Sequence, residues 1–132
     1  MEREDQYRHN ELTGKIIGCA MRVHTFLGPG FPESIYEKSL LIELVDSGLC
    51  CASQVERSIY YKGCYVGLRR LDIMVEDKII LELKAISDLD NSCYNKLINY
   101  LKIFDCDVGL LLNFGEARLQ FRRFVHSRHP MK

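Results

Sequence analysis

Two acids and a lysine in the middle of the chain have the types and spacing of a catalytic site. Glu82 and Lys84 alternate with Leu81 and Leu83 in an apolar run, and Asp72 comes ten residues before Glu82. Successive side chains of a strand point to opposite faces, so Leu81 and Leu83 enter one layer while Glu82 and Lys84 share the other. An acid and a base therefore emerge together from one face of a strand.

The loop before this strand decides whether Asp72 meets Glu82. A two-residue loop, 76–77, would put Asp72 opposite Leu81 and mix acids into the apolar layer. A three-residue loop, 76–78, puts Asp72 opposite Glu82 and keeps apolar residues together. We therefore predict the longer loop. It pairs Val75 with Ile79 and Ile73 with Leu81.

Carboxylates held opposite each other on paired strands indicate a metal site. The Cβ atoms of such a pair lie about 5 Å apart, and the two groups cannot both stay ionised cheaply without a cation between them. Few, hard oxygen ligands suit Mg²⁺ or Mn²⁺, which we expect Asp72 and Glu82 to bind. Lys84 would then orient the metal-bound water or neutralise charge on a scissile phosphate, so phosphodiester hydrolysis is the natural chemistry.

A salt-bridged patch on an exposed sheet face is the alternative interpretation of the same residues. An Asp followed ten residues later by Glu-x-Lys is a common pattern. Met74 and Ile80 fall on the same face, however, which predicts a covered face, and charges under a cover need a reason. Both interpretations stay open at the level of the residues.

Two helices are predicted before these strands. Apolar residues recur at spacings of three and four over 11–27, which is typical of an amphipathic helix, and Gly28-Pro29-Gly30 ends it. A second helix should begin near Pro32 or Glu33, with Gly48 as its C-terminal cap.

The remaining elements are predicted to build one sheet. Segments 54–61, 65–75 and 79–83 are rich in β-forming residues and read as a β-meander. Helical spacing returns over 90–104, and the apolar run 108–112 suits a buried strand, parallel to one already present. The tail after Asn113 is expected to be a short strand or a loop.

The predicted order is α-α-β-β-β-α-β, an α/β fold with a central mixed sheet of four strands flanked by helices. With 132 residues, 47% of them hydrophobic and 27% charged, the chain has the size and composition of a single domain, 1–132, with its core at about 10–125. No apolar stretch is long enough to span a membrane, and the charged start Met1-Glu-Arg-Glu-Asp5 is unlike a signal peptide, so we expect a cytoplasmic protein.

Cysteine spacing and charge limit the remaining function classes. The six cysteines are scattered without a zinc-binding spacing, so we expect reduced, mostly buried thiols. Eighteen basic and eighteen acidic residues cancel, so any contact with a phosphate backbone must be local. Basic residues gather at Arg69-Arg70 and toward the C-terminus, where an ordinary solvated surface explains them as well. The C-terminal ones are Arg118, Arg122, Arg123 and Arg128.

The segment Gly30-Phe-Pro-Glu33-Ser-Ile-Tyr36 resembles the signature of the GxxExxY protein family, a PD-(D/E)XK nuclease-like group. The resemblance covers roughly residues 10–125, and the order and spacing of its motifs argue against coincidence. The further matching segments are Lys15-Ile-Ile-Gly18 with His24, Leu27-Gly-Pro-Gly30, Tyr60-Tyr-Lys-Gly63, Arg70-Leu-Asp72, Leu81-Glu-Leu-Lys-Ala85, Asn99-Tyr-Leu101 and Gly109-Leu-Leu-Leu-Asn-Phe-Gly115.

The resemblance implies a restriction-endonuclease-like core and a magnesium site. It places Asp72, Glu82 and Lys84 on the catalytic motif, and Glu33 on the acid that the first core helix contributes in many such nucleases. A helix-dipole role explains Glu33 equally well. We expect substrate contacts from four further residues: Tyr36, Arg70, Lys96 and Tyr100.

One position departs from the family. Where Gln usually stands four residues before the helical Tyr, this chain has Lys96 before Tyr100. Lysine donates hydrogen bonds but cannot accept one, so a role that needs the amide oxygen is lost. His24 invites a ligand or base assignment, although packing or capping is the commoner role at such a place.

We therefore expect a Mg²⁺- or Mn²⁺-dependent nuclease acting on DNA or RNA, with Glu33, Asp72, Glu82 and Lys84 as its catalytic residues. The alternative is a non-catalytic module that keeps the nuclease-like fold and binds nucleic acid or a protein partner. Neutral net charge and Lys96 favour the module. The sequence leaves a homo-oligomer open.

Overall fold

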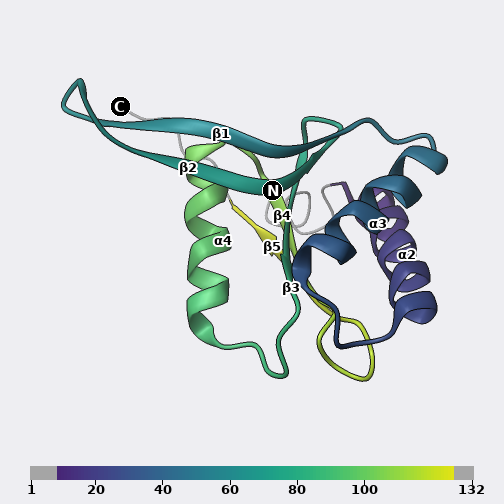
Figure 1. Cartoon of the computed structure of the whole chain (residues 1–132). Coiled ribbons are helices and arrows are strands. Elements are labelled where there is room, and N and C mark those ends of the chain that lie inside the picture. Colours follow the sequence, from purple (N-terminus) through teal and green to yellow (C-terminus); the bar gives the residue numbers. More distant parts are fainter. Residues whose placement is uncertain (1–8, 127–132) are drawn as a thin grey trace.

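A computed structural model describes residues 9–126 of the chain as helices packed on both faces of one mixed sheet (Figure 1). The first two helices precede the sheet, and the third lies between its third and fourth strands. The elements in chain order are α2 (Asn10–Leu27), α3 (Glu33–Asp46), β1 (Cys51–Tyr61), β2 (Cys64–Val75), β3 (Ile79–Lys84), α4 (Asn91–Ile103), β4 (Val108–Asn113) and β5 (Gln120–Val125).

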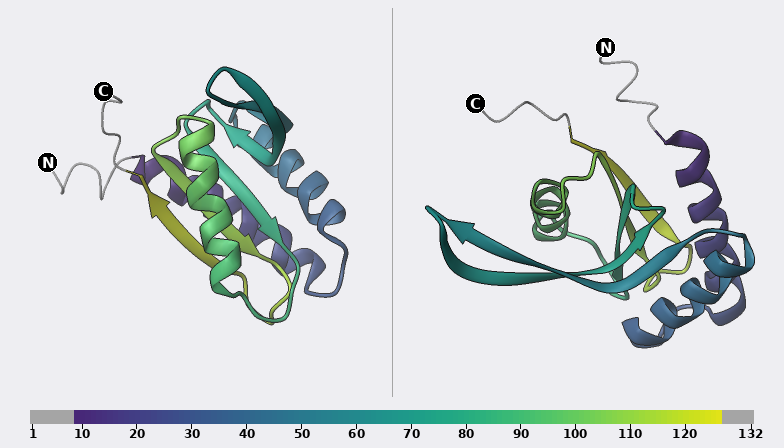
Figure 2. Two further views of the ribbon diagram at one scale, coloured as in Figure 1. Left: turned by 90° about the vertical axis from the view of Figure 1, so that its left-hand side faces the viewer. Right: turned by 90° about the horizontal axis from the view of Figure 1, so that it is seen from above.

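The sheet follows the order of the chain, β1-β2-β3-β4-β5. Among the strands of residues 9–126, only the β3–β4 pair is parallel, and α4 makes the crossover that this pairing requires. In the two views of Figure 2, α4 lies against one face of the sheet, and α2 and α3 lie on the other side. The α/β class and the mixed sheet are thus as predicted.

The predicted number of strands was too low, because Gln120–Val125 forms a fifth strand. It pairs antiparallel with β4 along its whole length. Every residue of β4 is buried, so its second edge needs a hydrogen-bonding partner inside the protein. Three of the six residues of β5 are polar, which hid the strand within a tail expected to be strand or loop.

The ends of the helices follow the predicted signals. Gly28 and Gly48 adopt φ angles of 70° and 80°, the left-handed region that glycine enters without strain. At the start of α4, the Asp90 side chain accepts a hydrogen bond from the Ser92 amide. Asp90, the first residue of the predicted segment 90–104, is therefore the N-cap of the helix.

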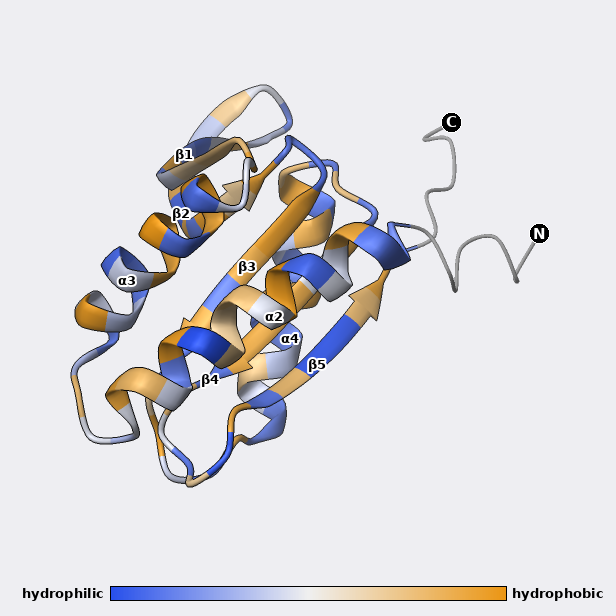
Figure 3. Cartoon of the chain, turned by 90° about the vertical axis from the view of Figure 1, so that its right-hand side faces the viewer, coloured by the Kyte–Doolittle hydropathy of each residue, from blue (hydrophilic) through white to orange (hydrophobic). Residues whose placement is uncertain are grey.

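Two hydrophobic cores lie on opposite faces of the sheet. Ile73, Leu81 and Leu83 pack with α2 and α3 in the first core, and Met74 and Ile80 pack under α4 in the second. The face predicted to carry Glu82 is therefore covered. Figure 3 shows hydrophobic colour along most of β3 and β4, behind α2.

The β2–β3 register is the one predicted from the three-residue loop. Ile73 pairs with Leu81 and Val75 with Ile79. Glu76 and Asp77 both turn at a φ of 54°, and the Lys78 amide donates to the Val75 carbonyl at 2.9 Å to close the loop.

The expectation for the cysteines was half right. All six are free thiols, but only Cys19, Cys93 and Cys106 are buried, whereas Cys50 and Cys64 are exposed. None of the helices in residues 9–126 has the length and apolar character of a membrane span.

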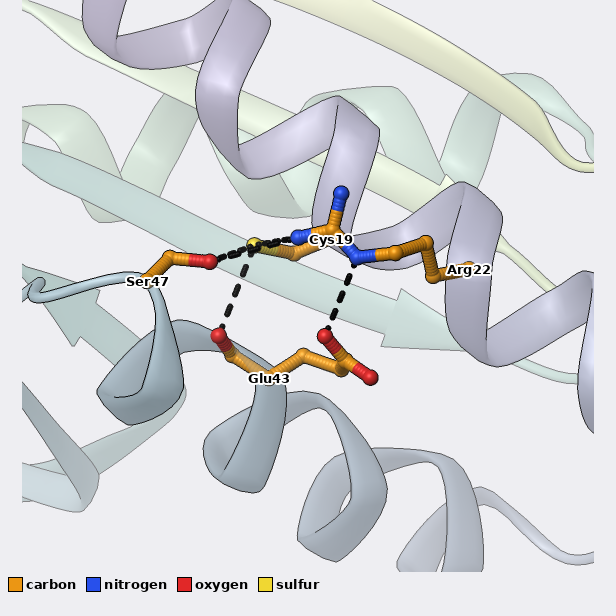
Figure 4. A network of polar contacts seen from close by, with 4 residues as sticks. All are labelled: Cys19, Arg22, Glu43 and Ser47. Atoms are coloured by element: carbon orange, nitrogen blue, oxygen red, sulfur yellow. Dashed lines mark hydrogen bonds and ion pairs between the residues drawn. The ribbon is translucent and has the colours of Figure 1, made fainter.

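A polar network ties α2 to α3 (Figure 4). Arg22 pairs with Glu43 at 3.1 Å and donates to the Ser47 hydroxyl at 3.2 Å, while the Cys19 sulfur lies 3.3 Å from that hydroxyl. The two helices are therefore held as one layer over the sheet.

Opposite effects are expected from Leu83→Asp and Lys84→Ala. Leu83 is 2% exposed within the first core, so an aspartate there buries an unpaired charge and should unfold the protein. The Lys84 side chain has no hydrogen bond or ion pair within residues 9–126, so its truncation should lower the melting temperature little. Thermal melts of both variants measure this, and equal losses would contradict the assigned faces.

Candidate active site

Asp72 lies where β2 separates from β3. The β2–β3 ladder reaches Ile73 and Leu81 and goes no further. At the next position the Leu83 amide donates to Asp72 Oδ2 at 2.8 Å, so a carboxylate takes the place of a backbone acceptor. The alternation of β2 breaks here as well, because Leu71 packs in the second core although Ile73 packs in the first. Opposite this break, Gln54 of β1 has a φ of 52°.

Glu82 is a carboxylate buried under α4. It is 1% exposed, and its Oε2 accepts an ion-paired hydrogen bond from Lys96 Nζ of α4 at 2.8 Å. Its other oxygen, Oε1, is buried and has no hydrogen-bond partner among the described residues. A buried carboxylate oxygen without a donor is costly, so it calls for a proton or a cation.

Burial and, to a lesser extent, the negative charge of Asp72 raise the pKa of Glu82, Lys96 opposes them, and the net result is a pKa of about 7. Burial lowers the pKa of Lys96, but the hydrogen bond to Glu82 and the nearby negative charges together outweigh it, so the net direction is upward. The negative charge of Asp72 thus acts on Glu82 as a like charge. The β-ladder itself does not include their pairing.

Asp72 also lines a hollow of about 180 Å³ with two acids of α3, Glu33 and Glu37. The other lining residues are Ser34, Gln54 and Leu83. Gln54 donates to Glu37 at 2.7 Å, while burial, Asp72 and Glu33 together raise the pKa of Glu37. Glu33 and Glu37 therefore line the same hollow as Asp72.

Lys84 is half-buried at the end of β3, on the strand face of Glu82. The segment that follows it is held by Asn113, which pairs with Lys84 across the parallel strands. The fully buried Asn113 amide accepts from the Ile86 amide at 3.1 Å and donates to the Ile86 carbonyl at 2.9 Å. A Cβ on Gly115 would come within 2.3 Å of the Ile86 carbonyl oxygen, so only glycine fits.

Two of the predicted substrate contacts are instead packed inside the protein. Tyr36 is fully buried, stacks on Phe114 and uses its hydroxyl to tie Gly28 and Phe31 into the loop before α3. Tyr100 is 5% exposed and packs edge-on against Phe104. Tyr36 therefore fixes the loop before α3, and Tyr100 is part of the second core under α4.

The other candidates have local partners. Arg70 is exposed and pairs with Glu56 at 2.8 Å, and Lys96 pairs with Glu82. His24 is buried, and its Nε2 lies 2.9 Å from the Glu116 carbonyl oxygen, which fits the packing role. Arg128 lies outside the described residues. Within residues 9–126, no three His, Cys, Asp or Glu side chains gather closely enough to hold a metal ion by themselves.

A family model described as the PD-(D/E)XK nuclease superfamily matches residues 10–124. The chain belongs to this superfamily. Asp72, Glu82 and Lys84, which the resemblance assigns to the motif of this superfamily, lie on strands β2 and β3. The GxxExxY resemblance remains a resemblance within that larger group.

The fold is also similar to a solved protein, SSO0001. The two share 18% sequence identity with a TM-score of 0.53, over 73% of this chain and 50% of that one. This chain thus spans about half the length of that protein, and the likeness concerns the fold alone. No curated protein matches the sequence.

Sequence reasoning missed Glu37, Gln54 and Asn113. Glu37 follows Glu33 by one helical turn, so a search for acids on the same face of α3 would have found it. Gln54 reaches the site through the irregular backbone of β1, which has no signal in the sequence. Asn113 lies within the matching segment Gly109-Leu-Leu-Leu-Asn-Phe-Gly115. It is a polar residue that ends an apolar run, and this was the signal that could have identified it.

The wild-type protein should lose stability as the pH rises from 4.5 to 7, and Glu82→Gln should remove this loss. A carboxyl whose pKa is raised on folding, here from 4.5 to about 7, is tolerated while protonated and costs stability once ionised. In the wild-type protein without metal, the free energy of unfolding should fall on the order of 3 kcal/mol over this range. Denaturant titrations across pH measure it. Glu11→Gln, on the exposed start of α2, is the control and should keep the fall.

Proposed function

We propose that this protein is a metal-dependent nuclease that hydrolyses phosphodiester bonds in DNA or RNA. The observation that carries the proposal is the buried Glu82 Oε1, which lacks a partner within the described residues beside the carboxylate of Asp72. Mg²⁺ is commonly held by one or two carboxylates together with water and substrate phosphate, so this pair is a sufficient protein ligand set. Mn²⁺ suits the same oxygen ligands.

Each motif residue has a role that its position supports. Asp72 and Glu82 would hold Mg²⁺ or Mn²⁺, which supplies a bound water of lowered pKa and neutralises phosphate charge. Asp72 is fixed by the Leu83 amide, so its carboxylate is oriented before any ligand arrives. Lys84 has no competing partner in the described part of the chain, and its ammonium is available to a water or a phosphate oxygen. Glu33 lines the same hollow as Asp72 and would assist there.

Substrate would approach the carboxylates from the side on which basic side chains are exposed to solvent. Besides Lys84, these include Lys96, which pairs with Glu82 and is 46% exposed, and the exposed Arg70, which lies two positions from Asp72 along β2. The buried Tyr36 and Tyr100 contribute by holding α3 and α4 in place.

A non-catalytic binding module is the second candidate, and Lys96 is the observation that favours it. Its ammonium occupies one oxygen of Glu82 at 2.8 Å and supplies part of the positive charge that a metal would bring. A site neutralised in this way needs no divalent ion to fold. The two candidates differ in whether a metal binds and whether a substrate is cut.

Cleavage of labelled DNA and RNA oligonucleotides with added Mg²⁺ or Mn²⁺ tests the proposal. The wild-type protein should cut at least one of them, and chelation should abolish cutting. Lys84→Ala should remain folded and lose about 100-fold or more in kcat, as expected when a group that stabilises transition-state charge is removed. Lys38→Ala, exposed on α3, should cut normally. Absence of cutting under every metal condition would favour the binding module.

Thermal melts of Asp72→Asn separate a metal site from a salt bridge. Without metal, the variant should melt higher, because a repulsion with Glu82 is removed while the amide oxygen still accepts from Leu83. Added Mg²⁺ or Mn²⁺ should stabilise the wild-type protein by mass action and leave the variant unchanged. A destabilised variant, with neither protein responding to divalent ions, would point to a structural ion pair.

Lys96→Gln should strengthen metal binding. It restores the residue usual in the family and removes a cation that competes for Glu82. An ion pair half open to water is worth about 1 kcal/mol at most, which corresponds to about fivefold in the metal concentration needed for half-maximal stabilisation. Melting temperature against metal concentration measures the shift. Lys102→Gln, on the same helix, should leave the midpoint unchanged, and weaker binding by Lys96→Gln would make Lys96 a supporting residue.

A further inference from the structure

The β1–β2 hairpin extends well beyond the sheet. β2 pairs with β3 only at residues 73–75, whereas it pairs with β1 from Cys64 to Val75. Figures 1 and 2 show the hairpin running past the end of α4 and away from the other strands. Between Glu56 and Arg70 most side chains of both strands are exposed, so this part of the hairpin contributes little to either hydrophobic core. We call residues 56–70 the arm.

Three tyrosines stand near the tip of this arm. Tyr60, Tyr61 and Tyr65 are 64%, 65% and 60% exposed, and Tyr60 and Tyr65 are cross-strand partners with ring centroids 6.1 Å apart. The edge-to-face contact of Tyr60 with Tyr65 and the position of Lys62 over Tyr61 support the hairpin locally, yet all three rings stay at least 60% exposed. They present flat apolar faces to a ligand.

The arm is basic although the chain as a whole is neutral. Residues 56–70 hold four basic side chains and one acid. Arg57 and Arg69 lie directly opposite each other, a like-charge pairing that destabilises a hairpin. Neither has a carboxylate partner within residues 9–126: Arg57 lies over the Phe104 ring at 5.4 Å, and Arg69 donates to the Leu68 carbonyl. An anion between them would offset the repulsion.

The arm leads directly away from the candidate active site. Arg70 and Arg69 precede Asp72 on the same strand, and Tyr65 is seven residues from Asp72. At about 3.3 Å per residue, the tyrosines lie roughly 23 Å along the strand from the carboxylate. A chain bound along the arm would therefore reach Asp72.

We infer that the β1–β2 hairpin is a binding arm for single-stranded nucleic acid, an inference that rests on the proposed nuclease function for its substrate class. Tyr60 and Tyr65 stack on unpaired bases, and Arg57 and Arg69 contact the phosphates between them and the active site. Stacking on ring faces needs bases released from pairing, which is why this surface suits a single strand better than a duplex.

Fluorescence anisotropy with labelled oligothymidylate and oligouridylate tests the arm, with chelator present so that nothing is cut. Tyr60→Ala/Tyr65→Ala should weaken binding about tenfold or more and keep the wild-type melting temperature. Phe26→Ala, which removes an 89% exposed ring of α2, should bind normally. Arg69→Ala should weaken binding and lower the slope of log affinity against log salt by about 0.7, while Lys15→Ala should not.

The outcomes separate this inference from the proposed function. Oligonucleotide binding that depends on the tyrosines, in a protein that never cuts, supports the arm and overturns the nuclease. Cutting that is undiminished in the tyrosine variant supports the nuclease and overturns the arm. Equal losses in Phe26→Ala, a duplex bound as tightly as the single strand, or no oligonucleotide binding at all would each overturn the arm.

Discussion

The hydrogen bond from the Leu83 amide to Asp72 Oδ2 is the interaction on which the candidate site and the arm both depend. A backbone amide in a buried strand must have an acceptor, and here a side chain supplies it where the β2–β3 ladder ends. The carboxylate thereby fills the gap between two separating strands. On one side it meets Glu82, and on the other it faces the acids of α3. Beyond it, β2 continues with β1 alone and becomes the arm.

Glu82 shows why the site needs a positive charge. Its burial is enforced by its neighbours, since Ile80 and Leu81 before it and Leu83 after it commit β3 to two cores. The carboxylate cannot move to water without displacing these residues. Lys96 partly compensates from α4, yet one oxygen remains without a partner in the described part of the molecule and the pKa stays near 7. The same strand therefore stabilises the fold through its leucines and carries, at Glu82, a buried carboxyl group whose pKa is near 7.

The β2–β3 register could be predicted from the sequence because it follows from the two-residue period of a strand, although the ladder ends before the predicted pairing of Asp72 with Glu82. Moving the β2–β3 pairing by one residue would have put Asp72 opposite Leu81, so the loop length was determined by the hydrophobic pattern. The break in the strand pattern at Asp72 and Gln54 was not predicted. The positive φ at Gln54 violates the alternation of side chains on which the prediction rests. Tyr36 and Tyr100 were misplaced for a related reason: an aromatic beside a motif looks alike whether its ring faces a ligand or a core.

A chain with no net charge can still hold a polyanion, because screening makes its field local. At physiological ionic strength, charges separated by more than about 8 Å are largely screened from each other. The acids around Asp72 and the basic residues of the arm are separated along β2 by distances of this order or greater toward the tip. A phosphate near Arg57 and Arg69 therefore senses those two cations more than the distant acids. At the carboxylates of the candidate site a phosphate would meet a cluster of negative charge, and there a divalent ion would make its approach favourable. A neutral net charge is therefore compatible with the proposed function, in which one local field would meet the backbone of a substrate and another would hold a metal.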